Sequence, residues 1–407
     1  MSAPGFAVAA LTSRIFWAML TLSLTALLGA SDFGNFAFIQ ITSVIVAQIV
    51  FGVLSNLVGA RMSIASNRLA DHILTVTLVY AAAMGALIFL ALAVVGFAGF
   101  EFLSSRASLI LVLWIYAVFA TGLTTGRYVA MKRYRRLATL FISQLVCYAA
   151  ALFLFGLRSG EMAALASAVG QILPIVALLC YDKKLVMPAG RKLRMVLGQL
   201  VGEHKHATYM NMAFIPSHVV LWLLVAGIAQ SVGDSEMARY GIGNQFATLF
   251  LFLPSAIANI AITHLSRTPG AANKTQSIVR ISAVLLGIGA GLTPLAYFSI
   301  GLASGWAPAL IIAARPEITI GLAMATLVAA RAPFAWHNQI EKNSTHEVAV
   351  AIISAVVLSV PLVLGTVEAG PLMTYRALAA FIGLMLSAFL YFQVRPRHRQ
   401  LGLSNAP

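Results

Sequence analysis

Long apolar segments alternate with short polar turns along the whole chain. Each segment is about 20 residues long, enough for a helix to cross a hydrocarbon core ~30 Å thick. A spanning helix satisfies its own backbone hydrogen bonds, so the pattern predicts helices and not strands. The segment 303–316 is apolar but is interrupted by Pro308 and Pro316, which indicates a hairpin or an interfacial piece. We predict about twelve spans, with the approximate limits 9–29, 34–58, 73–99, 107–126, 137–157, 161–181, 208–231, 240–264, 278–301, 317–336, 347–366 and 372–394.

The composition supports the same fold class. Sixty per cent of the 407 residues are hydrophobic and 10% are charged, too little charge to keep the surface of a soluble protein of this length in water. We therefore predict an all-α polytopic membrane protein. The longest polar connection, 182–207, lies near the middle of the chain and carries Pro188 and Gly190. We place a boundary there between two six-helix lobes, 1–195 and 196–407.

The two predicted lobes share a short sequence pattern. Gly29, Ser31, Asp32 and Phe36 recur as Gly233, Ser235, Glu236 and Tyr240, a shift close to half the chain. Both copies lie in a polar turn between two apolar segments. Membrane transporters are often built from two related bundles with the substrate path between them. The repeat therefore predicts an internal duplication, with chance similarity of two short turns as the alternative.

The basic residues predict the orientation in the membrane. The net charge is +15, and about 21 lysines and arginines fall in one set of alternate loops, against about five in the other. This bias places both termini in the cytoplasm by the positive-inside rule. Because the charges are spread over helix ends, we expect contact with anionic membrane lipids and not with nucleic acid. The richest basic run is 127–136.

Polar side chains form stripes on the first two predicted spans. Arg14, Trp17, Thr21 and Thr25 lie on one helical face of the first span. Arg14 has two interpretations, a ligand for substrate or a side chain that reaches the cytoplasmic interface. In the second span Asn56 belongs to a stripe of small and amide residues, which also suits close helix packing.

Further polar residues lie on the seventh and eighth spans. Asn211, His218 and Trp222 share one face of the seventh, and Gln245 and Asn259 lie on the eighth. A histidine within a span needs a partner or water, so His218 can pair with a substrate anion, carry a proton or bind a neighbouring helix. Under the duplication these two spans match the first two. A central cavity between the lobes would then be lined by amides, hydroxyls, one arginine and one histidine.

Several kinds of chemistry are missing from the sequence. No carboxylate lies in the middle of a predicted span: Asp71 and Glu347 fall in inner loops, and Asp32 and Glu317 in or beside outer turns. Cation-driven pumps usually need a buried carboxylate. The chain has no nucleophile, phosphate-loop or metal-ligand motif, and its two cysteines have no metal-ligand spacing. We therefore predict a protein that is not an enzyme, with no metal and no cofactor.

Two stretches resemble the bacterial polysaccharide flippases of the multidrug/oligosaccharidyl-lipid/polysaccharide exporter superfamily. One is the turn 31–37, with the pattern small–acidic–aromatic–Gly–x–aromatic–Ala, and the other is 236–267. The resemblance implies two six-helix lobes and a transporter in the bacterial inner membrane. It would flip a polyprenyl-pyrophosphate-linked oligosaccharide by alternating access, for surface polysaccharide (such as lipopolysaccharide) or exopolysaccharide assembly. Further partners would be a polysaccharide polymerase and a chain-length regulator.

On this interpretation Arg14 and Arg61 attract the pyrophosphate from the cytoplasmic side, because arginine donates paired hydrogen bonds to phosphate oxygens. The polyprenyl tail stays in lipid. A small-molecule exporter of the same superfamily is the main alternative, and a membrane glycosyltransferase or polymerase is another. The predicted substrate-binding residues are Arg14, Asn56, Arg61, Asn211, His218, Trp222, Gln245 and Asn259.

Overall fold

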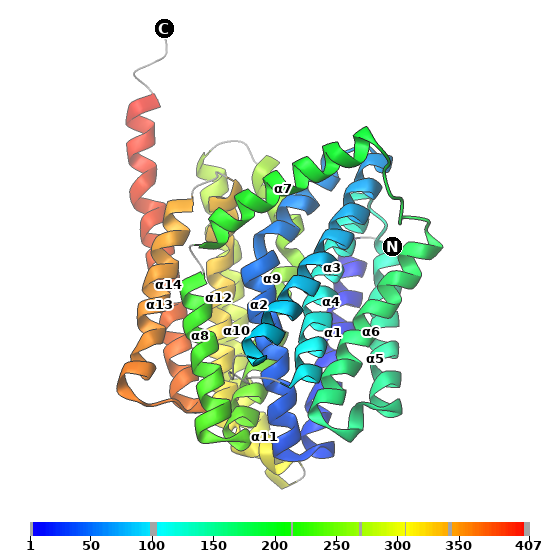
Figure 1. The fold of residues 1–407 in the computed structure, drawn as a ribbon. Helices are drawn as coiled ribbons and strands as arrows, with labels where there is room; N and C mark the ends of the chain where they lie inside the picture. The colour runs from blue at the N-terminus through cyan, green and yellow to red at the C-terminus, as the bar shows by residue number, and fades with distance from the viewer. Residues whose placement is uncertain are drawn as a thin grey trace. The chain divides into compact units, whose positions relative to one another are not determined.

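The structure is a computed structural model that describes residues 3–97, 104–212, 215–267, 271–305, 307–340 and 344–402. These residues form helices and turns and contain no strand. The long helices are α1 Ala3–Leu27, α2 Gly29–Ile64, α3 Asn67–Phe97, α4 Ser105–Ala130, α5 Tyr134–Leu154, α6 Gly160–Tyr181, α7 Arg191–Met212, α8 Ile215–Gly227, α9 Asp234–Arg267, α10 Ala271–Leu302, α12 Arg315–Ile340, α13 Ser344–Leu364 and α14 Ala369–Gly402 (Figure 1).

The predicted fold class is confirmed. Among the described residues, ten helices are long and apolar enough to cross a membrane. The predicted spans 9–29 and 240–264 fall on α1 and α9, whose side chains are described only in part. The broken segment 303–316 forms a 3₁₀ turn at Ala303–Gly305 and the short helix α11, Ala309–Ala313. The chain is thus an all-helical, multi-pass membrane protein.

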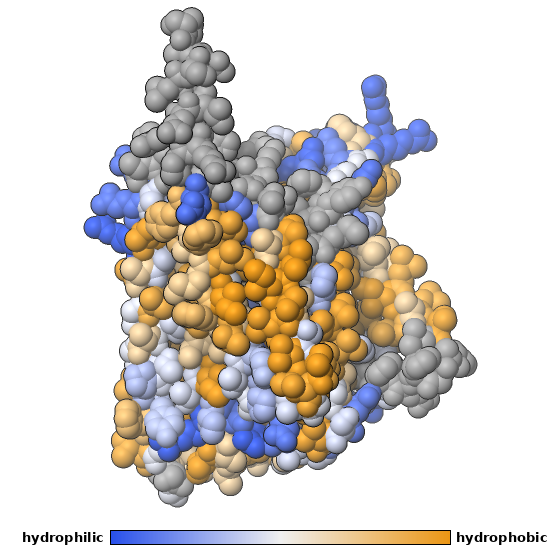
Figure 2. Space-filling model, turned by 90° about the vertical axis from the view of Figure 1, so that its left-hand side faces the viewer, coloured by the Kyte–Doolittle hydropathy of each residue, from blue (hydrophilic) through white to orange (hydrophobic). Residues whose placement is uncertain are grey.

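Exposed apolar side chains mark the surface that meets lipid. Leu90 and Val94 on α3 are about 60% exposed, as is Val356 on α13, and Phe153 on α5 is 78% exposed. Figure 2 shows hydrophobic side chains over much of the middle of one face, with hydrophilic ones gathered toward its edges. In water such a surface would aggregate, whereas hydrocarbon solvates it.

The chain forms two compact units. Unit 1 is Met1–Ile215 with Ala229–Ala238, and unit 2 is Pro216–Ile228 with Arg239–Pro407. In unit 1, α2, α4 and α6 pack on one another, α5 packs on α6, α1 on α5, and α3 on α4. Buried aromatic rings fill this core, for example the Phe51 and Phe119 rings, stacked with centroids 4.3 Å apart.

Unit 2 repeats this packing order. Its α12 packs on α10 and α14, and α13 packs on α14. Matching α3, α4, α5 and α6 with α10, α12, α13 and α14 reproduces the same neighbours in both units. Two similar bundles in one chain agree with the predicted internal duplication. The boundary between residues 195 and 196 stays a prediction.

The prediction of a polar loop at 182–207 is wrong over most of its length. Residues Arg191–Met212 form α7, which packs against α2 and α3 and lies across their upper ends in Figure 1. Val196, Leu200 and Ala207 bury one face of this helix. Its many charges lowered the average hydropathy, although the apolar residues keep a helical period. The seventh span accordingly begins at Ile215 and not at residue 208.

Candidate functional site

The polar stripe of α1 packs against α5. The Trp17 ring stacks on the Tyr148 ring, with centroids 4.1 Å apart and planes inclined by 19°. Thr21 is fully buried, and its hydroxyl oxygen lies 3.2 Å from that of Tyr148. Thr25 is buried too. Most of this stripe therefore fixes a helix pair inside unit 1.

Arg14 lies one turn before Trp17, on the same helix pair. Its guanidinium carbon lies 5.6 Å from the centre of the Phe141 ring, a cation–π geometry. The neighbouring Ser13 hydroxyl donates to the carbonyl of Phe141 at 2.9 Å. Arg14 is half-buried. The structure thus holds a cation against α5, and its role toward substrate stays a prediction.

Arg61 pairs with α7. It lies in the last turn of α2, and its Nη1 donates to the Glu203 Oε1 at 2.6 Å. Both side chains keep about a quarter to a third of their surface exposed, 32% for Arg61 and 26% for Glu203. The sequence predicted Arg61 as a phosphate ligand but did not reveal this carboxylate. A substrate anion would have to compete with Glu203.

The repeated turn has a structural role in unit 1. Gly29 has φ +79° and Gly233 has φ +110°, which favour glycine, and each precedes or begins a long helix. The Asp32 Oδ1 accepts a hydrogen bond from the backbone N–H of Gly160, at the start of α6. The Ser31 hydroxyl donates to the Asp234 Oδ2 at 2.6 Å. The motif that carries the family resemblance therefore joins helix ends.

In unit 2 His218 and Trp222 lie on α8, both partly exposed, and Gln245 is buried on α9. The side chains of Asn56, Asn211 and Asn259 lie outside the described residues. The contacts given above join Arg14 to Phe141 and Arg61 to Glu203, and neither partner was among the predicted site residues.

Sequence reasoning missed a partly buried polar cluster at the start of α9. The Arg376 Nη1 donates to the Tyr240 hydroxyl at 2.6 Å and to the Asn244 Oδ1 at 3.0 Å. The Arg239 Nη2 donates to the Glu317 Oε1 at 2.5 Å, and Glu317 is fully buried. The sequence did carry a signal for this cluster, because Arg376 lies inside the predicted span 372–394, where an arginine needs a partner.

Two further ion networks join neighbouring helices, one within each unit. In unit 1 Asp71 accepts from Arg127 at 2.9 Å and from Lys184 at 3.0 Å. In unit 2 Arg331, 204 residues after Arg127, donates to Glu347 and to the Ser387 hydroxyl.

These networks correct two predictions. Asp71 and Glu347 do not lie in inner loops: they are buried in the first turns of α3 and α13. Glu317 lies beside an outer turn as expected, but it is buried in the first turn of α12. Arg127, the first residue of the basic run, is 2% exposed and cannot contact lipid head groups. The predicted spans 73–99 and 347–366 start after α3 and α13 do, and the span 107–126 ends before α4 does, so polar residues of the first and last helical turns were counted with the loops.

Comparison with solved structures identifies the fold. No family model and no curated protein sequence matches the chain. The structure described as lipid II flippase MurJ, inward closed conformation, is similar with a TM-score of 0.69 and 14% identity, over 94% of this chain and 86% of that one. An inward-facing multidrug resistance MATE family transporter of the MOP superfamily has a TM-score of 0.59 and 12% identity, over 100% of this chain and 97% of that one. An outward-facing transporter of the same description has a TM-score of 0.55 and 12% identity, over 99% of this chain and 94% of that one. The chain therefore has the fold shared by these transporters.

Proposed function

We propose that this protein is a transporter that flips a polyprenyl-pyrophosphate-linked oligosaccharide across the inner membrane by alternating access, for surface or exopolysaccharide assembly. The observation that carries the proposal is the likeness in fold to a lipid II flippase over 94% of the chain. In this arrangement both termini face the cytoplasm. A polysaccharide polymerase and a chain-length regulator would act beside it.

Arginine chemistry supports an anionic lipid-linked substrate. Arg14 on α1 and Arg61 on α2 both lie in unit 1, and Arg61 is accessible enough to exchange partners. The guanidinium group binds pyrophosphate oxygens in pairs. In our proposal Asn56, Asn211, His218, Trp222, Gln245 and Asn259 contact the sugars.

Substitutions of Arg61 and of Glu203 should change substrate binding in opposite directions. If substrate phosphate replaces the Glu203 carboxylate on Arg61, Arg61→Ala should weaken substrate binding by about tenfold, the loss of one charge-assisted hydrogen bond. Glu203→Gln should instead strengthen binding several-fold, because the competing charge is removed. The measurement is binding of a polyprenyl pyrophosphate to the purified protein. If the ion pair only held α2 against α7, both variants should weaken binding of the polyprenyl pyrophosphate.

Arg14 gives a second prediction. Arg14→Ala should lower transport at least tenfold, whereas Arg14→Lys should keep part of it, because a lysine retains the charge but not the paired donors. The readout is export of the glycan in cells, normalised to the amount of folded protein in the membrane. Unchanged export by Arg14→Ala would remove Arg14 from the site and assign it to the packing of α1 on α5.

The first experiment is native mass spectrometry of the protein purified gently from its own membrane. A co-purified polyprenyl-pyrophosphate glycan that is lost in Arg14→Ala would support the proposal. Protein that carries ordinary phospholipid alone would count against it.

A small-molecule exporter is the second candidate, and the likeness to MATE transporters favours it. The fully buried carboxylate of Glu317 also suits an exporter driven by a cation gradient. Efflux of an organic cation that depends on a sodium or proton gradient, and that fails in Glu317→Gln, would establish this function in place of flipping.

A further inference from the structure

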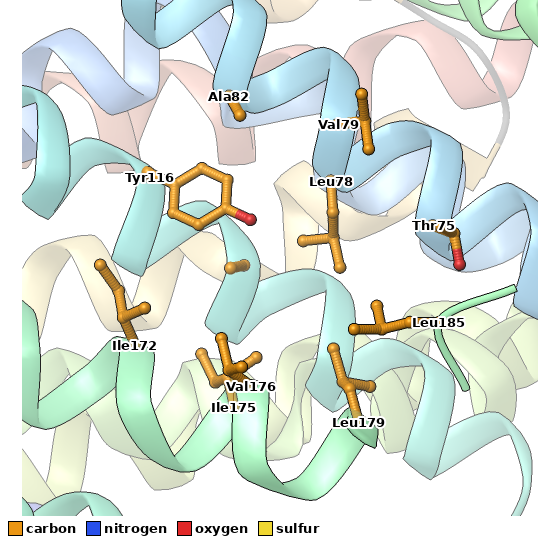
Figure 3. A pocket seen from close by; sticks show the side chains of 11 residues that line it. Thr75, Leu78, Val79, Ala82, Tyr116, Ile172, Ile175, Val176, Leu179 and Leu185 are labelled. Carbon is orange, nitrogen blue, oxygen red and sulfur yellow. The ribbon is translucent and has the colours of Figure 1, made fainter. Parts of the chain in front are cut away.

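Unit 1 contains a cavity that none of the proposed transport steps uses. It has a volume of about 310 Å³ and lies between α3, α4 and α6 (Figure 3). Leu78 and Ala82 from α3, Tyr116 from α4 and Ile175 from α6 are among its lining residues, and Leu185 closes one end. The lining is almost wholly apolar. The volume lies at the lower end of the range of small-ligand pockets.

The cavity opens on the surface of unit 1. Val79, Val176 and Leu185 line it and are 52%, 45% and 43% exposed. Ala82 is exposed as well. Since α3 and α6 are spans with exposed apolar side chains, a ligand that enters here comes from the hydrocarbon of the membrane.

A cluster of cations lies at the Leu185 end of the cavity. Lys184 directly precedes Leu185, and its Nζ lies 3.0 Å from the Asp71 carboxylate. Asp71 is one helical turn from Thr75, which lines the cavity and whose hydroxyl accepts a hydrogen bond from the backbone N–H of Val186. This bond fixes the segment that carries the lysines against α3.

The cluster has more cations than carboxylates. Asp71 pairs with Arg127 and Lys184, while Asp182 lies 3.8 Å from Arg133 and 3.4 Å from Arg136. Lys183, between Asp182 and Lys184, adds a further exposed cation. An excess of exposed positive charge beside an apolar cavity matches a molecule with an anionic head and an apolar tail.

We propose that this cavity binds one anionic glycerophospholipid, with part of an acyl chain between α3, α4 and α6 and the head-group phosphate at Lys183. The acyl chain is already in hydrocarbon before it binds, so burial from water contributes little and shape decides whether the tail fits. Charge decides which head group is preferred. The proposed lipid site does not depend on which substrate the protein transports.

Two adjacent alanines on α3 provide a matched test. Ala82 and Ala83 are both exposed, and only Ala82 lines the cavity. Delipidated protein is titrated with phosphatidylglycerol or phosphatidylcholine of identical acyl chains, and bound lipid is counted by native mass spectrometry. We expect one tightly bound phosphatidylglycerol in the unmodified protein and in Ala83→Phe, and at least tenfold weaker binding in Ala82→Phe.

A charge variant tests the head-group end. Lys183→Gln should reduce the preference for phosphatidylglycerol over phosphatidylcholine by about fivefold, the effect of one lysine near an anionic head group. Monodisperse elution shows that each variant is folded, and Ala82→Leu replaces Ala82→Phe if the larger side chain prevents folding.

Three results would overturn the proposal. One is equal lipid binding by the phenylalanine variants at 82 and 83, and another is no preference for phosphatidylglycerol in the unmodified protein. The third is displacement of phosphatidylglycerol by a polyprenyl phosphate at equal concentration, which would assign the cavity to the tail of a transport substrate.

Discussion

Replacing Asp71 with alanine should destabilise the protein by about 3–5 kcal/mol, the cost of leaving buried charge without its partner. The Asp71 carboxylate accepts from the Nε and Nη2 of Arg127 at 3.0 and 2.9 Å, and from the Lys184 Nζ at 3.0 Å. Arg127 is 2% exposed. Without Asp71, the guanidinium would keep its contacts with Asn67, the better of which is the carbonyl at 2.9 Å.

The double variant Asp71→Ala/Arg127→Leu tells whether the loss of stability in Asp71→Ala comes from unpaired charge or from lost packing. It removes the charges of Asp71 and Arg127 and leaves only Lys184 without this partner, so we expect it to recover about half or more of the stability that Asp71→Ala loses. Equilibrium unfolding in mixed micelles of rising SDS content measures each variant. Glu203→Ala is the matched control, because its pair with Arg61 is partly exposed and should contribute at most about 1 kcal/mol. Equal losses for Asp71→Ala and Glu203→Ala would contradict the argument.

The spans could be predicted from sequence because hydropathy alone decides which segments enter a membrane. For example, the predicted span 161–181 is α6, Gly160–Tyr181. The helix starts were less accurate, since first turns often carry polar residues. Asp71 lies in the first turns of α3, two residues before the predicted span 73–99. The ion network could not be foreseen, because Lys184 reaches Asp71 across 113 residues of sequence.

The site was harder to predict than the fold for the same reason. The face formed by Trp17 and Thr21 was visible in the sequence, but its partner Tyr148 is 127 residues away from Thr21. A polar face on a membrane helix suits a cavity and a helix contact equally well. Only the position of α5 shows that Trp17 and Thr21 serve the contact. The apolar residues of α7 repeat with a helical period in the sequence, but the many charges of this segment favoured a loop.

The repeated turn shows how one motif can carry both a family resemblance and a physical role. Asp32 belongs to the turn 31–37 that resembles polysaccharide flippases, and in the structure its carboxylate accepts a hydrogen bond at the N-terminus of α6. A carboxylate at a helix N-terminus is stabilised by the helix dipole and by the N–H groups there. The motif therefore supports the arrangement of helices and gives no information on the substrate of the proposed transport.

Gly160→Ala should cost about 3 kcal/mol, at the upper end of what overpacking costs. A Cβ atom at this position would lie 2.0 Å from the carbonyl oxygen of Asp32 and 2.9 Å from the backbone nitrogen of Phe36. Both atoms belong to the backbone of α2, so no side-chain rotation can relieve the overlap. The helices α2 and α6 would have to separate, and the hydrogen bond from the Gly160 N–H to Asp32 would lengthen or break.

A second glycine provides the control with the opposite expected sign. Gly198 lies in α7 with nothing within 4 Å of the position of an added Cβ. Gly198→Ala should therefore stabilise the protein by up to ~1 kcal/mol, because alanine favours the helix. The same unfolding titration measures both variants. If Gly160→Ala were tolerated as well as Gly198→Ala, α2 and α6 would not be held together by backbone contact, and Asp32 would lose its assigned role at the start of α6.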